Sequence, residues 1–270
     1  MYPFFDIFGR TVGSYAVCCF IGIFISVAVA TRLGKNFKIT FEDMILLMVT
    51  LSFGILIGGS SVYALTNLEK IIKYTGIAVE KIASSTLTFS HIKYIISECF
   101  GGMVFYGGFI GATLALKIYI KFSKIHDRHI LSDIFAISVP LFHTFGRIGC
   151  FLGGCCYGVE SSYGFIAQNE LLPEMSGIRR FPVALVESVL NFLIFLMLLY
   201  LFRKEKKRGR MLFVYMITYP PIRFCLEFFR GDEIRGIFFG LSTSQWISIV
   251  IFAVGVMGLY KKNSSYVTKS

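Results

Sequence analysis

The residues best suited to chemistry lie within or beside apolar segments, and cations stand out among them. His143, Arg147 and Cys150 are spaced by four and three residues, which places them on one face of a helix. A charge inside a bilayer costs at least ~2.5–3.5 kcal/mol on insertion scales, so it faces the protein interior and marks either a functional site or an ion pair. We expect a functional role for Arg147. Neighbouring glycines, Gly146 among them, can pack helices or let backbone amides approach an anionic ligand.

A second charged group follows Pro220-Pro221 in another apolar segment. Arg223, Glu227 and Arg230 are spaced by four and three residues, so two cations flank one anion on a helical face. Arg223 and Glu227 can neutralise each other as an ion pair, or either can bind a ligand. The surplus positive charge favours an anionic ligand. A phosphate would suit Arg147 together with Arg223 or Arg230, because guanidinium groups bind its oxygens through two parallel hydrogen bonds.

Glu187 is a carboxylate in an otherwise apolar segment, with Asn191 four residues later. A buried carboxylate needs a partner. We expect Glu187 to orient an arginine rather than to act on a substrate.

Tyr106 precedes a glycine pair, Gly107 and Gly111, whose spacing of four is typical of close helix packing in membranes. From its position alone, Tyr106 is more readily an aromatic anchor at the membrane boundary than a catalytic group.

Cys150, Cys155 and Cys156 form the densest group of thiols in the sequence. Adjacent cysteines are poorly placed around one tetrahedral zinc ion, and the sequence has no C-x-x-C motif, so we expect no metal site. Thiol redox chemistry stays open as an alternative. The sequence also has no P-loop and no dinucleotide-binding fingerprint, so we expect no cofactor.

The elements that hold these residues are predicted to be transmembrane helices. Of the 270 residues, 55% are hydrophobic and only 16% are charged, which excludes an ordinary soluble protein. The apolar residues form blocks close to the ~20 residues that span a bilayer. We therefore predict an all-α, polytopic integral membrane protein with about seven transmembrane helices. The predicted spans are Val12–Thr31, Met44–Leu65, Met103–Ile120, Leu131–Leu152, Phe181–Phe202, Met211–Phe228 and Thr243–Leu259.

The net charge of +11 is a topology signal here, because the basic residues lie in alternate short loops. The positive-inside rule places the N-terminus outside and the C-terminus in the cytoplasm. We expect the first apolar block to be retained, since it is longer than a signal-peptide core and Arg32 follows it. Without an internal repeat, residues 1–270 are predicted to form a single transmembrane domain with external loops at about 67–98 and 154–180, and nucleic acid is not expected as a partner.

The motifs together resemble the bacterial phosphatidylglycerol prolipoprotein diacylglyceryl transferase family. The central match is Gly146-Arg147-Ile148-Gly149 with Phe151. Other matches are Gly107-Gly108-Phe109-Ile110-Gly111, Arg180 and Pro182 with Glu187, Arg223 with Glu227-Phe228-Phe229-Arg230, Tyr15, and Ala30-Thr31-Arg32.

The resemblance implies transfer of the diacylglyceryl group of phosphatidylglycerol to the lipobox cysteine of preprolipoprotein signal peptides, in the bacterial inner membrane. Glycerol phosphate would be released, Arg147 would bind the lipid phosphate, and Arg223 would be a second cationic contact. Tyr106, Arg147 and Arg223 are the expected catalytic residues. The expected substrate-binding residues are Arg147, Gly146, Cys150, His143, Tyr15, Glu187, Glu227 and Arg230.

The sequence departs from the family pattern at several polar positions. Tyr106 stands where the family usually has histidine, Cys150 replaces the signature asparagine, and Cys155 replaces a glutamate. Ala184 and Val186 replace a glutamine and a tyrosine before Glu187. A tyrosine with a pKa of ~10 is a poorer general base than histidine near neutral pH. The chain is therefore expected to be a divergent member, with a different lipid headgroup or external thiol chemistry through Cys150, Cys155 and Cys156 as the alternative function.

Overall fold

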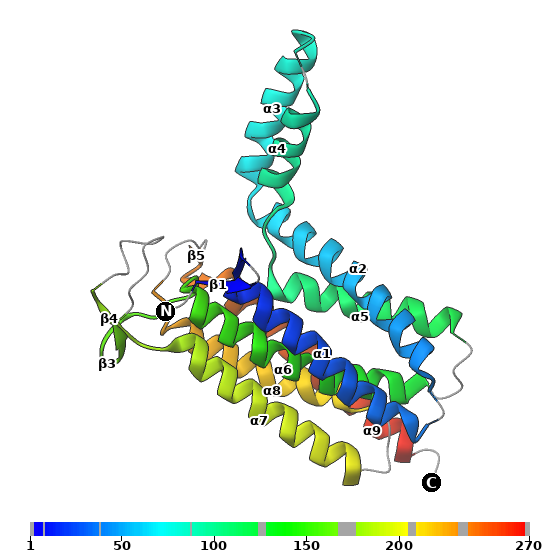
Figure 1. The fold of residues 1–270 in the computed structure, drawn as a ribbon. Coiled ribbons are helices and arrows are strands. Elements are labelled where there is room, and N and C mark those ends of the chain that lie inside the picture. Colours follow the sequence, from blue (N-terminus) through cyan, green and yellow to red (C-terminus); the bar gives the residue numbers. More distant parts are fainter. Residues whose placement is uncertain are drawn as a thin grey trace. The chain divides into compact units, whose positions relative to one another are not determined.

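The computed structural model describes residues 3–7, 9–37, 39–86, 88–123, 128–166, 177–204, 209–231 and 237–267. Most of them are helical (Figure 1). The helices are α1 (Ser14–Lys35), α2 (Phe41–Thr66), α3 (Leu68–Ala83), α4 (Phe89–Phe100), α5 (Phe105–Phe122), α6 (Arg128–Gly153), α7 (Val183–Lys204), α8 (Met211–Glu227) and α9 (Thr243–Val267). The strands form the antiparallel pairs β1 (Phe4–Ile7) with β2 (Arg10–Gly13), β3 (Glu160–Ile166) with β4 (Arg179–Arg180), and β5 (Ile237–Phe238) with β6 (Leu241–Ser242).

Five helices among the described residues, α1, α2, α6, α7 and α9, are long and apolar enough to cross a membrane. A sixth span results if α4 and α5, which meet at a bend of 95°, are taken as one. The prediction of a polytopic, all-α membrane protein is confirmed. The number of seven spans and the orientation of the termini stay predictions. Helix α8 has 17 residues, which at 1.5 Å per residue is about 26 Å, against the ~30 Å of a bilayer core.

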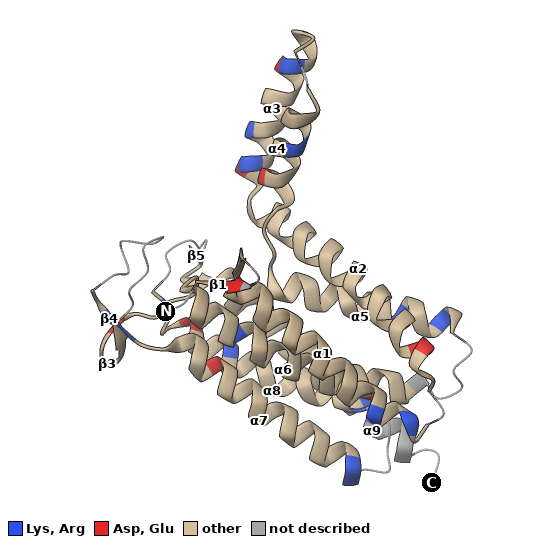
Figure 2. Ribbon diagram, in the orientation of Figure 1, with Lys and Arg blue, Asp and Glu red and all other residues tan. Residues whose placement is uncertain are grey.

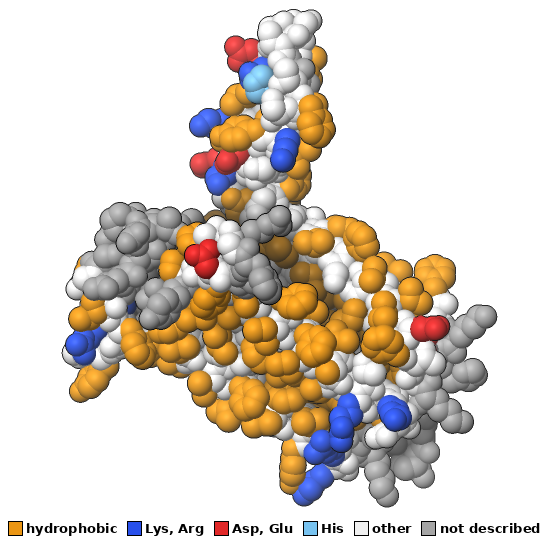
Figure 3. Space-filling model, viewed as in Figure 1, with side chains coloured by type: hydrophobic (Ala, Val, Ile, Leu, Met, Phe, Trp, Pro, Cys, Tyr) orange, Lys and Arg blue, Asp and Glu red, His pale blue; other side chains and the backbone are white. Residues whose placement is uncertain are grey.

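The chain divides into two compact units, of which unit 1 comprises Met1–Thr40 and His126–Ser270. Its centre is α6, which packs against α1, α7 and α8, while α9 packs on α8 (Figure 1). In the apolar span of α6, 72% of the residues are buried, against 22% in α1. The outer face of α1 exposes large apolar side chains such as Phe20 and Phe24 (Figure 3). This surface is suited to lipid, whereas α6 carries the polar groups inward.

Helix α1 approaches α6 closely because one face of α1 carries small side chains. The buried residues of α1 recur every four positions: Ser14, Cys18, Gly22, Ser26, Ala30 and Gly34. A Cβ added at Gly22 would lie 2.8 Å from Cβ of Phe145, and one added at Gly149 would lie 3.0 Å from Cα of Tyr15. Small residues at a spacing of four let membrane helices pack backbone to backbone.

Asp133 on α6 holds the start of α8. Its carboxylate is fully buried and accepts hydrogen bonds from the backbone N–H groups of Gly209 (2.7 Å) and Met211 (2.9 Å). Both amides lie at the N-terminus of α8, where unpaired donors and the helix dipole favour a negative charge. One acidic side chain thus fixes the helix that carries Arg223 against the central helix.

Replacing Asp133 with alanine is expected to destabilise the protein by about 3 kcal/mol, because two buried amides lose their acceptor. The thermal unfolding midpoint in detergent should fall clearly. Asp133→Asn keeps one carbonyl oxygen and should lose less. An unchanged midpoint for Asp133→Ala would refute this anchoring role.

Unit 2 comprises Phe41–Ile125 and is built on the contact of α2 with α5. Gly54 and Gly58 of α2 face Gly107 and Gly111 of α5, and a Cβ added at Gly54 would lie 2.5 Å from the carbonyl oxygen of Gly111. The close helix packing predicted from the glycine pair is confirmed.

The segment 67–98, which we predicted to lie outside the membrane, contains the helical hairpin of α3 and α4 (Figure 1). No side chain of α3 is buried. The hairpin is held by Tyr74 against Tyr94, whose ring centroids are 5.8 Å apart, and Thr88 with His91 forms a capping box at the start of α4. Helices α3 and α4 of the hairpin carry several charged side chains, whereas α2 and α5 carry few (Figure 2). The amphipathic helix predicted near residues 71–81 lies in α3.

The basic residues in the last turns of α1 and α7 lie at the same end of unit 1 (Figure 2). These residues are Arg32 and Lys35 in α1, and Arg203 and Lys204 in α7. Lys38 and Lys124, which belong to the basic short loops on which the predicted topology rests, lie outside the described residues. Residues 167–176 of the predicted loop 154–180 lie outside them as well.

Candidate active site

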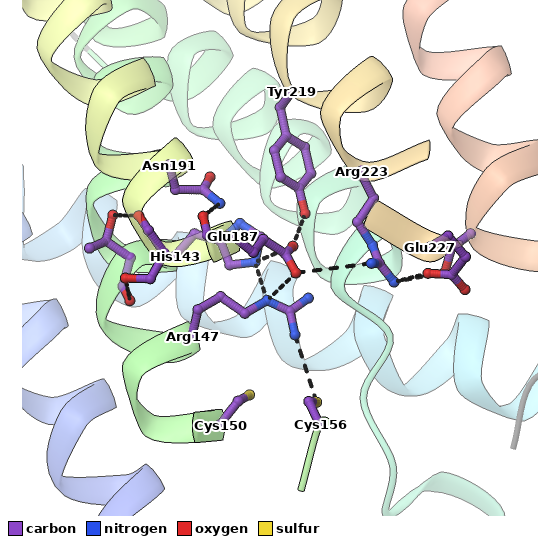
Figure 4. Close-up of polar contacts among 12 residues, drawn as sticks. His143, Arg147, Cys150, Cys156, Glu187, Asn191, Tyr219, Arg223 and Glu227 are labelled. Carbon is purple, nitrogen blue, oxygen red and sulfur yellow. Dashed lines mark hydrogen bonds and ion pairs between the residues drawn. The ribbon is translucent and has the colours of Figure 1, made fainter. Parts of the chain in front are cut away.

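The polar centre of unit 1 is Glu187, in the second turn of α7 (Figure 4). Its side chain is completely buried. The hydroxyl of Tyr219 donates a hydrogen bond to Oε1 (2.8 Å), and Nε of Arg147 lies 3.1 Å from Oε2. Nη1 of Arg223 lies 4.0 Å from the same Oε2. A single carboxylate from α7 therefore lies between guanidinium groups from α6 and α8, and its charge is compensated by both.

Arg147 is held at both ends of its guanidinium group. Nε donates its hydrogen to Nε2 of His143 (3.2 Å), one helical turn earlier, and Nη1 donates to Sγ of Cys156 (3.7 Å). His143 packs edge-on against the ring of Tyr219, with 5.2 Å between ring centroids. Only 8% of Arg147 is exposed. The spacing of His143 and Arg147 predicted one helical face, and the structure confirms their contact.

Arg223 makes the predicted ion pair with Glu227, with 2.6 Å between Nη2 and Oε2. Nη2 also lies 3.4 Å from Oγ of Ser244 on α9. The other nitrogen, Nη1, is buried and makes no hydrogen bond within the described part of the chain. A buried guanidinium N–H without an acceptor is costly. An anionic ligand would supply the missing acceptor.

The three cysteines converge where α6 ends. Gly154 has a φ of +67°, a left-handed conformation that favours glycine, and Cys155 N–H donates to Cys150 C=O while Gly154 N–H donates to Phe151 C=O. These two bonds define a Schellman motif, which reverses the chain after the helix. The reversal returns Cys155 and Cys156 to Cys150. The three Sγ atoms all lie within 4.8 Å of one another.

The thiol of Cys156 lies in a positive environment. Hydrogen bonds from the Cys150 and Cys155 thiols lower the pKa of Cys156, and the charges of Arg147 and Arg230 lower it further. The cluster thus joins the arginine site through Arg147 (Figure 4).

The remaining predicted residues occupy different surroundings. Tyr15 on α1 is half exposed and its backbone lies against Gly149, while a Cβ added at Gly146 would meet nothing within 4 Å. Arg230 follows α8, and its backbone pairs with Gly158. Tyr106 lies on α5 of unit 2, where it is buried beside Phe105. A role for these residues in binding or catalysis stays a prediction.

The sequence reasoning missed Tyr219 and Ser244, although both contact the charged centre. Tyr219 had a usable signal, because Tyr219, Arg223 and Glu227 are spaced by four residues on α8. Ser244 had none, since its contact with Arg223 depends on how α9 packs on α8. Asn191, noted beside Glu187, donates to the backbone carbonyl of Glu187 (2.8 Å).

Comparison with known proteins identifies relatives over nearly the whole chain. The phosphatidylglycerol–prolipoprotein diacylglyceryl transferase of Clostridium tetani (strain Massachusetts / E88) is 30% identical over 254 residues, which cover 93% of this chain and 94% of the relative. The phosphatidylglycerol–prolipoprotein diacylglyceryl transferase 2 of Clostridium perfringens (strain 13 / Type A) is 32% identical over 264 residues, which cover 96% and 93%. The corresponding transferase of Campylobacter hominis is 29% identical over 269 residues, which cover 96% and 91%.

The family model described as prolipoprotein diacylglyceryl transferase matches residues 3–261, a range that includes α1 to α8 and most of α9. Tyr106, Cys150 and Cys155, at which the sequence was expected to depart from the family pattern, all lie within the matched range. With a match of this extent and relatives at about 30% identity, the chain belongs to the prolipoprotein diacylglyceryl transferase family.

Proposed function

We propose that this protein transfers the diacylglyceryl group of phosphatidylglycerol to the lipobox cysteine of preprolipoproteins and so takes part in lipoprotein maturation. The observation that carries the proposal is the pair of buried guanidinium groups, Arg147 and Arg223, on either side of Glu187, within a chain of this family. Nη1 of Arg223 is buried and makes no hydrogen bond within the described part of the chain, which supports an anionic ligand at this place. The lipid phosphate is such a ligand.

The reaction needs negative charge to be stabilised on a leaving group. The acceptor thiol loses its proton to solvent and its sulfur forms a bond to the terminal glycerol carbon of the diacylglyceryl group. The bond from that carbon to the phosphate ester oxygen breaks, and glycerol phosphate leaves with the electron pair. Guanidinium groups fixed in advance stabilise the charge as it develops. Glu187 keeps Arg147 and Arg223 in place, and Tyr219 holds the carboxylate.

The residues around this charged centre either support the arginines or face the substrate. We assign His143, Glu227 and Arg230 to the support of the arginines, and Gly146, Cys150 and Tyr15 to the substrate-facing side of α6 and α1. Tyr106 stays the candidate catalytic residue of unit 2, at the place where the resemblance puts the family histidine.

The setting of the reaction is the bacterial inner membrane. We propose seven spans in a single transmembrane domain, with the N-terminus outside and the C-terminus in the cytoplasm, because the basic residues lie in alternate short loops. The partners are then membrane phosphatidylglycerol and the signal peptides of preprolipoproteins.

The test is a transfer assay with the purified protein in detergent containing phosphatidylglycerol and a lipobox peptide. Mass spectrometry should show a diacylglyceryl adduct on the cysteine, and a peptide with serine in place of that cysteine should stay unmodified. Phosphatidylethanolamine and phosphatidic acid are the matched lipid controls. An adduct with another lipid alone would assign a different headgroup, and a folded protein that gives no adduct with any of the lipids would contradict the proposal.

A further inference from the structure

Cys150, Cys155 and Cys156 form a cluster in unit 1 that could bind a metal ion. Their spacing along the sequence does not indicate such a site. Adjacent cysteines are poorly placed around one tetrahedral ion and the sequence has no C-x-x-C motif, which is why we expected no metal site from the sequence. The Schellman turn at Gly154 brings Cys150 back to them, and all three Sγ atoms lie within 4.8 Å of one another. Sγ of Cys155 and Sγ of Cys156 are 4.0 Å apart. Zinc–sulfur bonds of about 2.3 Å place tetrahedral ligands about 3.8 Å apart, so small side-chain rotations suffice.

The group offers three ligands and no fourth. Within the described residues, no further His, Cys, Asp or Glu joins Cys150, Cys155 and Cys156. Three protein ligands with one open position are typical of catalytic zinc sites, whereas structural sites have four. Thiolates select soft or borderline ions such as Zn²⁺ and Cd²⁺ over Mg²⁺ and Ca²⁺.

The positive charge of Arg147 beside the cluster would stabilise thiolates that bind a cation. Three thiolates and one divalent cation carry a net charge of −1, and Nη1 of Arg147 lies 3.7 Å from Sγ of Cys156. This is the guanidinium group to which we assign the lipid phosphate. A fourth ligand on the ion would therefore lie near the place where the phosphate ester is bound.

We propose that Cys150, Cys155 and Cys156 bind one thiophilic divalent cation of the zinc class, and that the cation's open position binds and deprotonates the acceptor thiol. The inference rests on the proposed transferase function. The acceptor thiol gives its proton to solvent on binding, because a thiol that coordinates zinc is deprotonated. Its sulfur then forms the bond to the glycerol carbon, glycerol phosphate leaves with the electron pair of the broken carbon–oxygen bond, and the ion undergoes no redox change.

A bound cation would supply a means of deprotonating the acceptor thiol that does not depend on Tyr106. A tyrosine at position 106 is a weak base near neutral pH. By the resemblance to the family, Cys150 and Cys155 stand where an asparagine and a glutamate are expected.

The first test measures binding without activity, using Co²⁺ as the spectroscopic probe in the whole purified protein under a phosphine reductant. We expect one Co²⁺ per chain, with the visible bands of four-coordinate cobalt and thiolate charge transfer. A lipobox peptide should raise the charge-transfer absorbance by about a third, as thiolates increase from three to four. The peptide with serine in place of cysteine should leave the spectrum unchanged.

Variants locate the site. Cys155→Ser is the main variant, because Cys155 is exposed and serine is close to it in size, so the fold should persist. It should bind Co²⁺ at least tenfold more weakly, as should Cys156→Ser. Cys225→Ser is the matched control, since Cys225 is exposed on α8 and outside the cluster, and it should bind as the wild type does. Equal binding by wild type and Cys155→Ser, or no binding by folded wild type with free thiols, would overturn the site.

The second test measures transfer after metal removal. Chelation should lower the rate of adduct formation at least tenfold, and Zn²⁺ should restore it. A chelated protein that keeps its full rate would overturn the role in activation, as would a cobalt spectrum that does not respond to the cysteine peptide. A protein whose cobalt form shows the spectral response but whose zinc form makes no adduct would contradict the transferase function and leave the acceptor-binding site supported.

Discussion

Glu187→Gln is expected to reduce transfer at least a hundredfold and to lower the free energy of unfolding by about 3–5 kcal/mol. The carboxylate is fully buried and compensates Arg147 at 3.1 Å and Arg223 at 4.0 Å. Glutamine keeps the shape and can still accept from Tyr219, but Arg147 then loses the carboxylate beside it, while Arg223 keeps its ion pair with Glu227. Removing one partner of a buried ion pair leaves such an uncompensated charge. The measurements are the rate of adduct formation and the thermal unfolding midpoint in detergent.

Two variants serve as controls for this change. Tyr219→Phe removes a single hydrogen bond to the carboxylate and should cost only about 1.5–3 kcal/mol. Glu69→Gln neutralises an exposed carboxylate on α3 and should change neither quantity. If Glu187→Gln transfers and unfolds as the wild type does, the carboxylate does not hold the arginines.

Arg147→Ala is expected to lower the maximal rate of transfer by about 10²–10³-fold, the usual loss when a donor to developing negative charge is removed. The effect should fall on kcat more than on KM, because the contact strengthens as charge develops on the departing phosphate. Arg147→Lys keeps the charge and loses the planar fork of donors, so its rate should be intermediate. Initial rates at several concentrations of phosphatidylglycerol separate kcat from KM.

The matched control for Arg147 is Arg203→Ala, which removes an exposed arginine from the last turn of α7. It should transfer at the wild-type rate. Because Arg147→Ala also leaves Glu187 with one partner fewer, rates are compared well below the unfolding midpoint of each variant. Wild-type kinetics in a folded Arg147→Ala protein would remove this arginine from the reaction.

Much of the architecture follows from local patterns in the sequence. Apolar blocks of about 20 residues predicted the long helices, and a spacing of three or four residues predicted which side chains share a helical face. The contacts of Arg147 with His143 and of Arg223 with Glu227 were predictable for this reason, since both partners lie on one helix. The close packing of α5 was predictable from Gly107 and Gly111, because small residues at that spacing have few other uses in a membrane helix.

Contacts between helices depended on the tertiary structure. The sequence required a partner for Glu187, but only the rotation and packing of α6, α7 and α8 place Arg147, Tyr219 and Arg223 around one carboxylate. The hairpin of α3 and α4 was expected as an external segment with one amphipathic helix, because no buried face marks its pairing.

The sequence by itself determined the membrane class, the long helices, the family and the residues that share a helical face, since each depends on composition, periodicity or motifs read along the chain. The tertiary structure alone decided that one carboxylate lies between two arginines from different helices. It also decided that three cysteines, two of them adjacent, meet at one point. The physical reason is that helical periodicity relates only residues within the same helix. Contacts between helices depend on how complete helices rotate and pack, and the convergence of the thiols depends on a left-handed turn at Gly154.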